Sequence, residues 1–223
     1  LEFRRVLFRS ASCLVDERYL RVVPQVGYLL GPKLIELGFQ AREELPLVTL
    51  AGPYLDELSA LTGDTIHLAI REGDEVLYLH KNPGRNGPEM RSRVGHRMPL
   101  ARTGIGKALM LDDTQQEWQR LYEVSLPTGG KNQFWPQHPE QSWEQFQQRM
   151  VEYVAGGYAF DLEDNEPSIR CVAAPIRDAS KRIVAGISIA STVPYMPLEK
   201  MAELIPLIKG VTARLSAELG AKI

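Results

Sequence analysis

The chain has 223 residues, and its 26 lysines and arginines nearly balance its 28 aspartates and glutamates, giving a formal net charge of −2. This length allows one substantial core, or one ordinary domain with a fragment of a second, and the small charge excludes a strong overall attraction to nucleic acid or membranes. The two cysteines, Cys13 and Cys171, have no Cys-x-x-Cys spacing. We therefore expect no metal site, no cofactor and a reducing cytoplasm.

The first part of the chain predicts only a fragment of a domain. Residues 1–10, LEFRRVLFRS, begin without methionine and lack the apolar core of a signal peptide, so we treat them as a non-native leader. A helix end is expected at 11–17, a hairpin across 19–30 around Pro24-Gln25, and a helix at 33–41. No apolar run approaches the ~18 residues of a membrane span, so no membrane partner is expected.

The rest of the chain predicts an α+β domain with a mainly antiparallel sheet flanked by helices. Apolar residues at helical spacing predict a helix over 47–61, and two β-rich runs around Glu72-Gly73-Asp74 predict a hairpin. A loop rich in proline and glycine separates two polar helices later in the chain. The remaining expected elements are a strand at 90–94, helices at 114–122 and 142–153, strands at 169–176 and 183–189, and a helix at 198–219.

The stretch Pro99–Leu111, PLARTGIGKALML, predicts a turn that enters a helix. Thr103 is a good N-cap, and the glycines after it let the backbone come close to a ligand. The first amides of such a helix lack partners and suit a small anion such as a carboxylate. A nucleotide phosphate loop is excluded because Ala101 and Ala108 replace its first glycine and its hydroxyl residue. A simple turn that uses glycine for packing stays open.

Five motifs in order resemble the effector-binding domain of the IclR family of bacterial transcriptional regulators, over nearly all of residues 19–220. They follow GYLLGPKLIELG, which looks like the exit from a winged helix-turn-helix into a linker helix. The five are PYLDELSALTGDTIHLAI, RVGHRMPLARTGIGKAL, GGYAFDLEDNEPSIRCVAAPIRD, ISIAS and LSAELG.

The resemblance implies a GAF-like domain and a domain order. Residues 1–30 would hold the leader and a remnant of the winged helix-turn-helix, 31–45 the linker helix, and 46–223 the effector-binding domain. The resemblance implies roughly sixty residues before the wing, whereas only thirty precede Gly31 here. We therefore expect the DNA-recognition helix to be truncated or overwritten.

The resemblance also implies a ligand site and no catalytic residue. The backbone N–H groups of Gly104 and Ile105 would cradle a carboxylate, and the side chains of Asp161, Cys171 and Ser188 would contact the ligand's polar groups. Many members carry a second serine two residues after the first, and this chain departs from them by having Ala190 there. Lys107 is left out of the site, because we expect it to point away along its helix and pair with an acid.

The partners implied by the resemblance are a small organic acid, operator DNA in the full-length protein, and further copies of the chain as a homodimer or dimer of dimers. Within the family, this chain looks most like regulators that sense sugar acids such as 2-keto-3-deoxygluconate, with pyruvate or glyoxylate as the simpler choice. A polyol acid needs more polar partners than pyruvate or glyoxylate does. Six basic side chains are candidates for such partners, and for each of them a structural or solvent-exposed role is the alternative. The candidates are His67, His80, Lys81, Arg91, Arg93 and His96.

Two other function classes stay open. One is an enzyme acting on a small keto acid, with Cys171 as nucleophile and His67 or His80 as base. No orienting third residue is apparent, and a thiol inside a strand lacks the electropositive setting that activates cysteine. The other is an oligomerisation module whose pocket stays empty.

Overall fold

The computed structural model describes residues 11–43, 46–126 and 141–222, so the leader and the predicted proline- and glycine-rich loop lie outside the described residues. Contacts divide the chain into two compact units, residues 1–49 and 50–223. The boundary falls in the first turn of helix α3 (Pro46–Thr62). Within the described ranges, no helix combines the length and apolarity needed to span a bilayer.

The first unit contains the predicted hairpin and helix. Residues 11–16 are helical, β1 (Leu20–Val23) pairs antiparallel with β2 (Gly27–Leu30), and α2 (Lys33–Glu43) follows. Gln25 and Gly27 take φ values of 65° and 104°, which lets the hairpin turn tightly after Pro24. The hairpin across 19–30 and the helix at 33–41 are thus confirmed.

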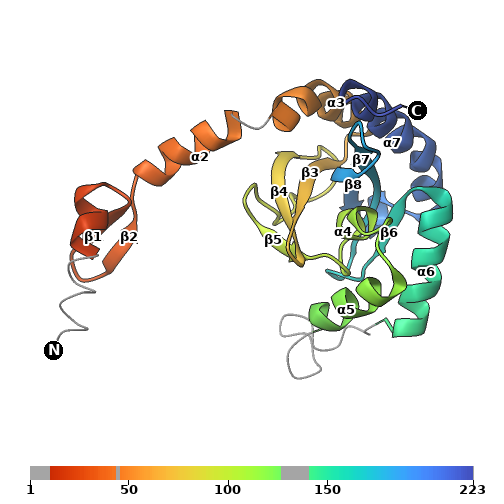
Figure 1. The fold of residues 1–223 in the computed structure, drawn as a ribbon, viewed down its shortest axis with the longest axis horizontal. Coiled ribbons are helices and arrows are strands. Elements are labelled where there is room, and N and C mark those ends of the chain that lie inside the picture. The colour runs from red at the N-terminus through yellow and green to blue at the C-terminus, as the bar shows by residue number, and fades with distance from the viewer. Residues whose placement is uncertain (1–10, 44–45, 127–140, 223) are drawn as a thin grey trace. The chain divides into compact units, whose positions relative to one another are not determined.

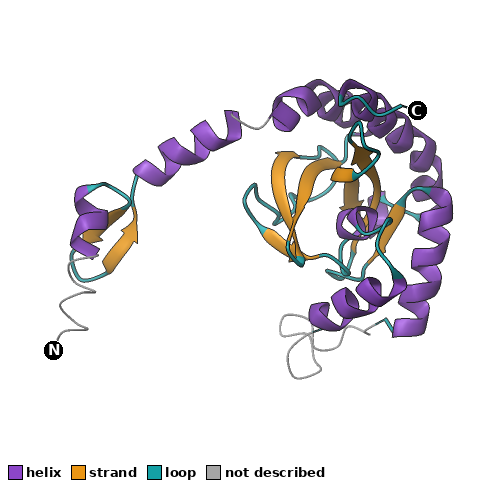
Figure 2. Ribbon diagram, in the orientation of Figure 1, coloured by secondary structure: helices purple, strands orange, loops and turns teal. Residues whose placement is uncertain are grey.

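The second unit is built on a six-stranded sheet with the order β5-β4-β3-β8-β7-β6, in which each neighbouring pair is antiparallel (Figure 1). The predicted α+β class is confirmed, with helices arranged around a curled sheet (Figure 2). The elements after α3 are β3 (Thr65–Glu72), β4 (Glu75–Asn82), β5 (Arg97–Pro99), α4 (Gly104–Leu109), α5 (Gln115–Ser125), α6 (Trp143–Gly156), β6 (Ala159–Leu162), β7 (Ile169–Arg177), β8 (Ile183–Thr192), a 3-10 turn (Val193–Tyr195) and α7 (Leu198–Glu218).

One face of this sheet is covered by α7, which contacts β7 and β8. The Arg177 amide at the end of β7 donates to Ser216 Oγ of α7 at 2.9 Å. Helices α3 and α7 lie side by side, because Arg214 pairs with Glu57 at 2.6 Å and its guanidinium sits 5.3 Å from the Tyr54 ring. The face beneath α7 carries large buried aliphatic side chains such as Ile187.

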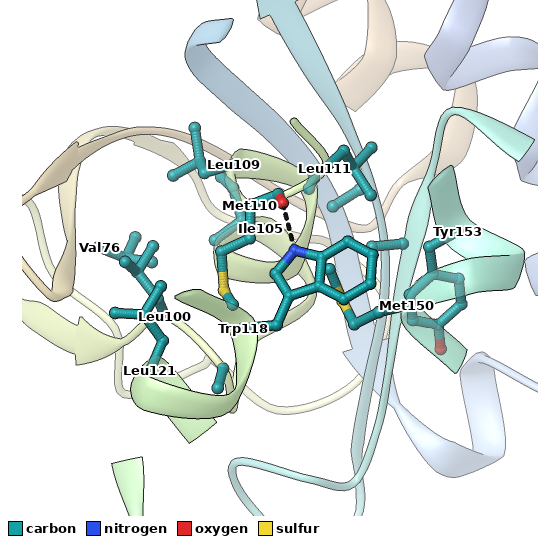
Figure 3. Packing of buried hydrophobic residues seen from close by; sticks show 14 of the residues in the cluster. Val76, Leu100, Ile105, Leu109, Met110, Leu111, Trp118, Leu121, Met150 and Tyr153 are labelled. Atoms are coloured by element: carbon teal, nitrogen blue, oxygen red, sulfur yellow. Dashed lines mark hydrogen bonds between the residues drawn. The ribbon is translucent and has the colours of Figure 1, made fainter. Parts of the chain in front are cut away.

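The short helix α4 covers the opposite face and contacts β6, β7 and β8. Side chains alternate along a strand, so Ile187 and Ser188 point to opposite faces. The α4 side continues into a hydrophobic cluster that includes Ile105, Met110 and Trp118 (Figure 3). The Trp118 indole N–H donates to the Met110 carbonyl at 2.8 Å, which satisfies its one polar atom inside the cluster.

The predicted strand at 90–94 is wrong, and β5 begins only at Arg97. The Lys81 ammonium takes the Met90 and Ser92 carbonyls at 2.8 and 3.0 Å, so these groups do not join a ladder. Gly95 has a φ of 84° and turns the chain, and pairing with β4 starts there through Tyr78. The other predicted strands and helices of this unit are confirmed with small changes of their ends.

Candidate functional site

The turn into α4 begins the candidate site, and Thr103 caps this helix as predicted. Its backbone is extended, with φ −96° and ψ 149°, and its hydroxyl accepts the Gly106 N–H at 3.0 Å. A Cβ on Gly104 would lie 2.5 Å from Cys171 Sγ and 2.9 Å from the Asp161 nitrogen. Glycine is needed at 104 because the helix start lies directly against two strands.

The strands bring the remaining predicted residues to the face beneath α4. Asp161 on β6 is paired with Cys171 on β7. Ser188 on β8 is paired with Ala173, two residues along β7 from Cys171, so it shares the same face. Ile105 is buried on α4 with its side chain against β8, where a Cβ on Gly186 would lie 3.1 Å from Ile105 Cγ1.

Two further polar side chains, His67 and Tyr78, extend this face. His67 on β3 is directly paired with Ser188, and its Nδ1 lies 3.3 Å from Ser188 Oγ. Its Nε2 lies 2.8 Å from Ser92 Oγ, and its ring centroid is 4.9 Å from that of Tyr78. His67 was among the polar candidates from sequence. Tyr78 was missed, because a bulge between Tyr78 and His80 breaks the alternation of β4 and puts these two side chains on opposite faces.

One amide of the first turn of α4 has a partner in the N-cap side chain: the Gly106 N–H donates to Thr103 Oγ1 at 3.0 Å. The Gly104 backbone lies against the Cys171 side chain, since a Cβ at position 104 would be 2.5 Å from Sγ. A sulfur atom is at most a weak acceptor, so a carboxylate oxygen would be a stronger partner for the Gly104 N–H.

The ionisation of these groups disfavours covalent catalysis. Burial raises the pKa of the Cys171 thiol to about 12, and the nearby Asp161 adds to the rise. Burial, with the nearby Lys81 ammonium, lowers the pKa of His67 to about 3. Both ring nitrogens of His67 face serine hydroxyls, and His80 bonds Asn82 at 2.7 Å from the other face of β4. A neutral buried thiol is a poor nucleophile.

Lys107 is fully buried, and its predicted pairing with an acid is confirmed. Its ammonium contacts the Asp164 carboxylate and donates to the Phe160 carbonyl at 3.1 Å, while Arg149 pairs with Asp164 at 3.0 Å. The Asp164 N–H donates to Asp161 Oδ1 at 2.8 Å. Lys107 therefore lies beside the site instead of pointing away from it, which corrects that expectation.

The pKa values of the two carboxyl groups near Lys107 are shifted in opposite directions. Burial raises the pKa of Asp161, and the Lys107 charge offsets only part of that rise. Burial would also raise the pKa of Asp164, but its contact with the Lys107 ammonium leaves it lowered. Asp161 is thus the carboxyl group more readily protonated, and a protonated acid can donate a hydrogen bond to an anionic ligand.

The other basic candidates hold the loop after β4 instead of lining the site. Lys81 and Arg93 both donate to the Met90 and Ser92 carbonyls. Arg91 and His96 are exposed. The loop segment around Ser92 is therefore fixed next to His67. The cationic groups of Lys81 and Arg93 bind the backbone carbonyls of this loop.

A cavity of about 290 Å³ lies elsewhere on the second unit, at the other end of α4. Its lining includes Arg71 and Arg182, whose guanidinium groups are paired with Asp113 at 2.6 Å and Asp178 at 2.9 Å. Neutralised in this way, the arginines of this cavity offer little to an organic acid.

Comparison with known proteins gives consistent matches. Residues 39–217 match the family model described as "Bacterial transcriptional regulator IclR C-terminal". The HTH-type transcriptional regulator KdgR of Escherichia coli K12 is 29% identical over 213 residues, covering 91% of this chain and 79% of that protein. The crystal structure of the IclR protein of Thermotoga maritima aligns with a TM-score of 0.77 and 26% identity, covering 96% of this chain and 84% of that one.

A second solved structure shares the fold at lower identity. It is an IclR homologue from Microbacterium hydrocarbonoxydans complexed with 4-hydroxybenzoate. It aligns with a TM-score of 0.76 and 19% identity over 95% of this chain and 83% of that one. At that identity the likeness concerns the fold alone.

Proposed function

Since the chain belongs to the IclR family of bacterial transcriptional regulators, we propose that its second unit binds a small organic acid and thereby controls operator binding by the full-length regulator. The observation that carries the proposal is the convergence of Gly104, Asp161, Cys171 and Ser188 on one buried face beneath α4. Ser188 is bonded to His67 and Asp161 accepts from the Asp164 amide, so a ligand would exchange these contacts for its own.

Each residue has a role in this proposal. The N–H groups of Gly104 and Ile105 donate to the carboxylate. Asp161, Cys171 and Ser188 contact the ligand's other polar groups. Lys107 is assigned no contact with the ligand, because its ammonium is already paired with Asp164.

Regulation requires that the acid bind two states of the assembled protein with different affinity. We propose that the chain acts as a homodimer or a dimer of dimers, as the family resemblance implies. A sugar acid of the 2-keto-3-deoxygluconate type, or a shorter keto acid such as pyruvate or glyoxylate, is the proposed effector class. The 4-hydroxybenzoate in the Microbacterium homologue supports carboxylate recognition on this fold.

The enzyme alternative is the weaker one. Its nucleophile, Cys171, is a buried thiol with a pKa raised to about 12. The relatives found by comparison are named as transcriptional regulators. A regulator needs to bind its ligand without converting it. Neutral hydrogen-bonding groups such as those around Cys171 can bind a ligand in this way.

A thermal-stability screen tests the proposal. The panel is pyruvate, glyoxylate, 2-keto-3-deoxygluconate and 4-hydroxybenzoate, and we expect at least one acid to raise the melting temperature without being consumed. Gly104→Val should weaken the binding of the best ligand by more than about tenfold, since its side chain would clash with Cys171 and the Asp161 backbone and push the α4 turn away from the strands. The matched control is Gly210→Val in α7, where a Cβ meets nothing within 4 Å.

Two results would count against the proposal. Unchanged affinity in Gly104→Val would remove the α4 turn from the site. Product formation that disappears in Cys171→Ala would favour the enzyme instead.

A further inference from the structure

The loop that follows β4 is fixed against the end of α3. Gly63, directly after the last residue of α3, has a φ of 68°, a conformation that glycine adopts without strain. Its carbonyl accepts the Arg85 and Asn86 N–H groups at 2.8 and 3.1 Å. A Cβ on Gly63 would lie 2.8 Å from the Asn86 side-chain nitrogen, so the loop and the helix end are in close contact.

Two side chains of this loop donate to the last carbonyls of α3, which have no partner inside the helix. The Arg85 guanidinium donates to the Ser59 and Ala60 carbonyls at 3.4 and 3.3 Å. The Asn86 side-chain amide donates to the Thr62 carbonyl at 3.2 Å. This end of a helix carries the negative pole of its dipole. A cation and a neutral amide therefore suit the position, and a carboxylate does not.

Asn86 is followed by Gly87, and this is the one Asn-Gly pair in the chain. Both residues are exposed, and Gly87 has no side chain to shield its backbone nitrogen. Such a nitrogen can attack the side-chain carbonyl carbon of the asparagine before it. A five-membered imide then forms, and ammonia leaves with the proton of the glycine N–H. Water opens the imide at either carbonyl and leaves aspartate or its β-linked isomer, so water is the only other reactant.

We propose that Asn86 is a site of spontaneous deamidation, and that its conversion to a carboxylate releases the loop after β4 from the end of α3. The product has an oxygen in place of the N–H donor, so the hydrogen bond to the Thr62 carbonyl is lost. It also adds a negative charge at the negative end of the helix. This site is separate from the proposed acid site, and the inference does not rest on the proposed function.

Mass spectrometry of the full chain after storage in mildly alkaline buffer tests the chemistry. The peptide that contains Asn86 should gain about 1 Da, because –NH₂ is replaced by –OH. Asn82 is the internal control, because the next residue, Pro83, has no N–H with which to form the imide. Trypsin separates the two asparagines by cutting after Arg85. Storage in mildly acidic buffer should slow the conversion, because the attacking nitrogen must lose its proton.

Thermal denaturation measures the release of the loop. Asn86→Asp, which carries the charge of the product, should melt about 2–4 °C below wild type. Asn86→Ala loses the hydrogen bond without gaining a charge, so its melting temperature should lie between the two. Gln116→Glu is the matched control, because it makes the same change of an amide to a carboxylate in the first turn of α5, where the helix end is positive. We expect no fall in its melting temperature.

Two results would overturn the inference. If Asn86 gains mass no faster than Asn82, the exposed Asn-Gly pair is not a modification site. If Asn86→Asp melts at the same temperature as wild type, the Asn86 amide does not hold the loop to α3. The inference is supported when the stored protein gains mass at Asn86 and its melting temperature moves toward that of Asn86→Asp.

Discussion

The two faces of the six-stranded sheet come from the same strands but differ in composition. The face toward α7 is lined by large buried aliphatic side chains: Ile66, Leu68, Val172, Ile176, Ile187 and Ile189. The face toward α4 carries small or polar ones: His67, Ala69, Tyr78, Cys171, Ala173, Ser188 and Ala190. Both sets are buried, so burial alone does not distinguish a core from a site.

The difference follows from what each face gains by being buried. Aliphatic side chains gain about 25 cal/mol for each Å² removed from water, whereas buried polar groups gain little even when they are hydrogen-bonded. The α7 face therefore stabilises the fold. The α4 face contributes less to the stability of the fold, as we expect of a surface that binds a ligand.

The largest effect is expected at the ion pair beneath α4. Lys107→Met leaves Asp164 buried with only Arg149 as its charged partner, so the free energy of unfolding should fall by about 3–5 kcal/mol. Urea denaturation measures it. Arg120→Met is the control, because its pair with Asp74 is exposed and should matter little. Stability equal to wild type in Lys107→Met would show that the polar face is not held by this pair.

A pair of adjacent substitutions on β8 tests the two faces directly. Ile187→Ala should lower the free energy of unfolding by about 2–5 kcal/mol, because it removes a fully buried side chain from the α7 face. Ser188→Ala should cost about 1 kcal/mol or less, yet weaken acid binding. Denaturation and calorimetry together check both. Equal losses of stability would contradict the division between a stabilising face and a binding face.

A further loss of stability is expected from acid. His67 has a folded pKa of about 3 against an ordinary value of 6.5, so the unfolded chain binds the proton first as the pH falls. This group's contribution to stability is therefore intact above about pH 6.5 and is lost toward pH 3, by up to about 1.4 kcal/mol per pH unit. His67→Gln should lose less stability than wild type between pH 7 and 4.5. Identical slopes would mean that the imidazole is not held neutral.

The local patterns of the sequence predicted most of the second unit. Alternation and turn residues predicted the pairs β3–β4 and β7–β8, and the N-cap at Thr103 predicted where α4 begins. These features depend on residues close together in the chain, so local spacing is enough to find them. The segment 90–94 failed because its carbonyls are taken by the side chain of Lys81.

For the site, the sequence by itself determined which residues share a face along β7 and β8, since side chains alternate along an unbroken strand. In β4 a bulge after Tyr78 breaks the alternation, so Tyr78 and His80 face opposite sides. Only the tertiary structure decided that Tyr78 and His67 join Ser188, that Lys107 is buried beside Asp161, and that Cys171 lies against Gly104. Those facts depend on the curl of the sheet and on a helix packed across three strands. Contacts of that kind join residues far apart in the chain, and no local spacing encodes them.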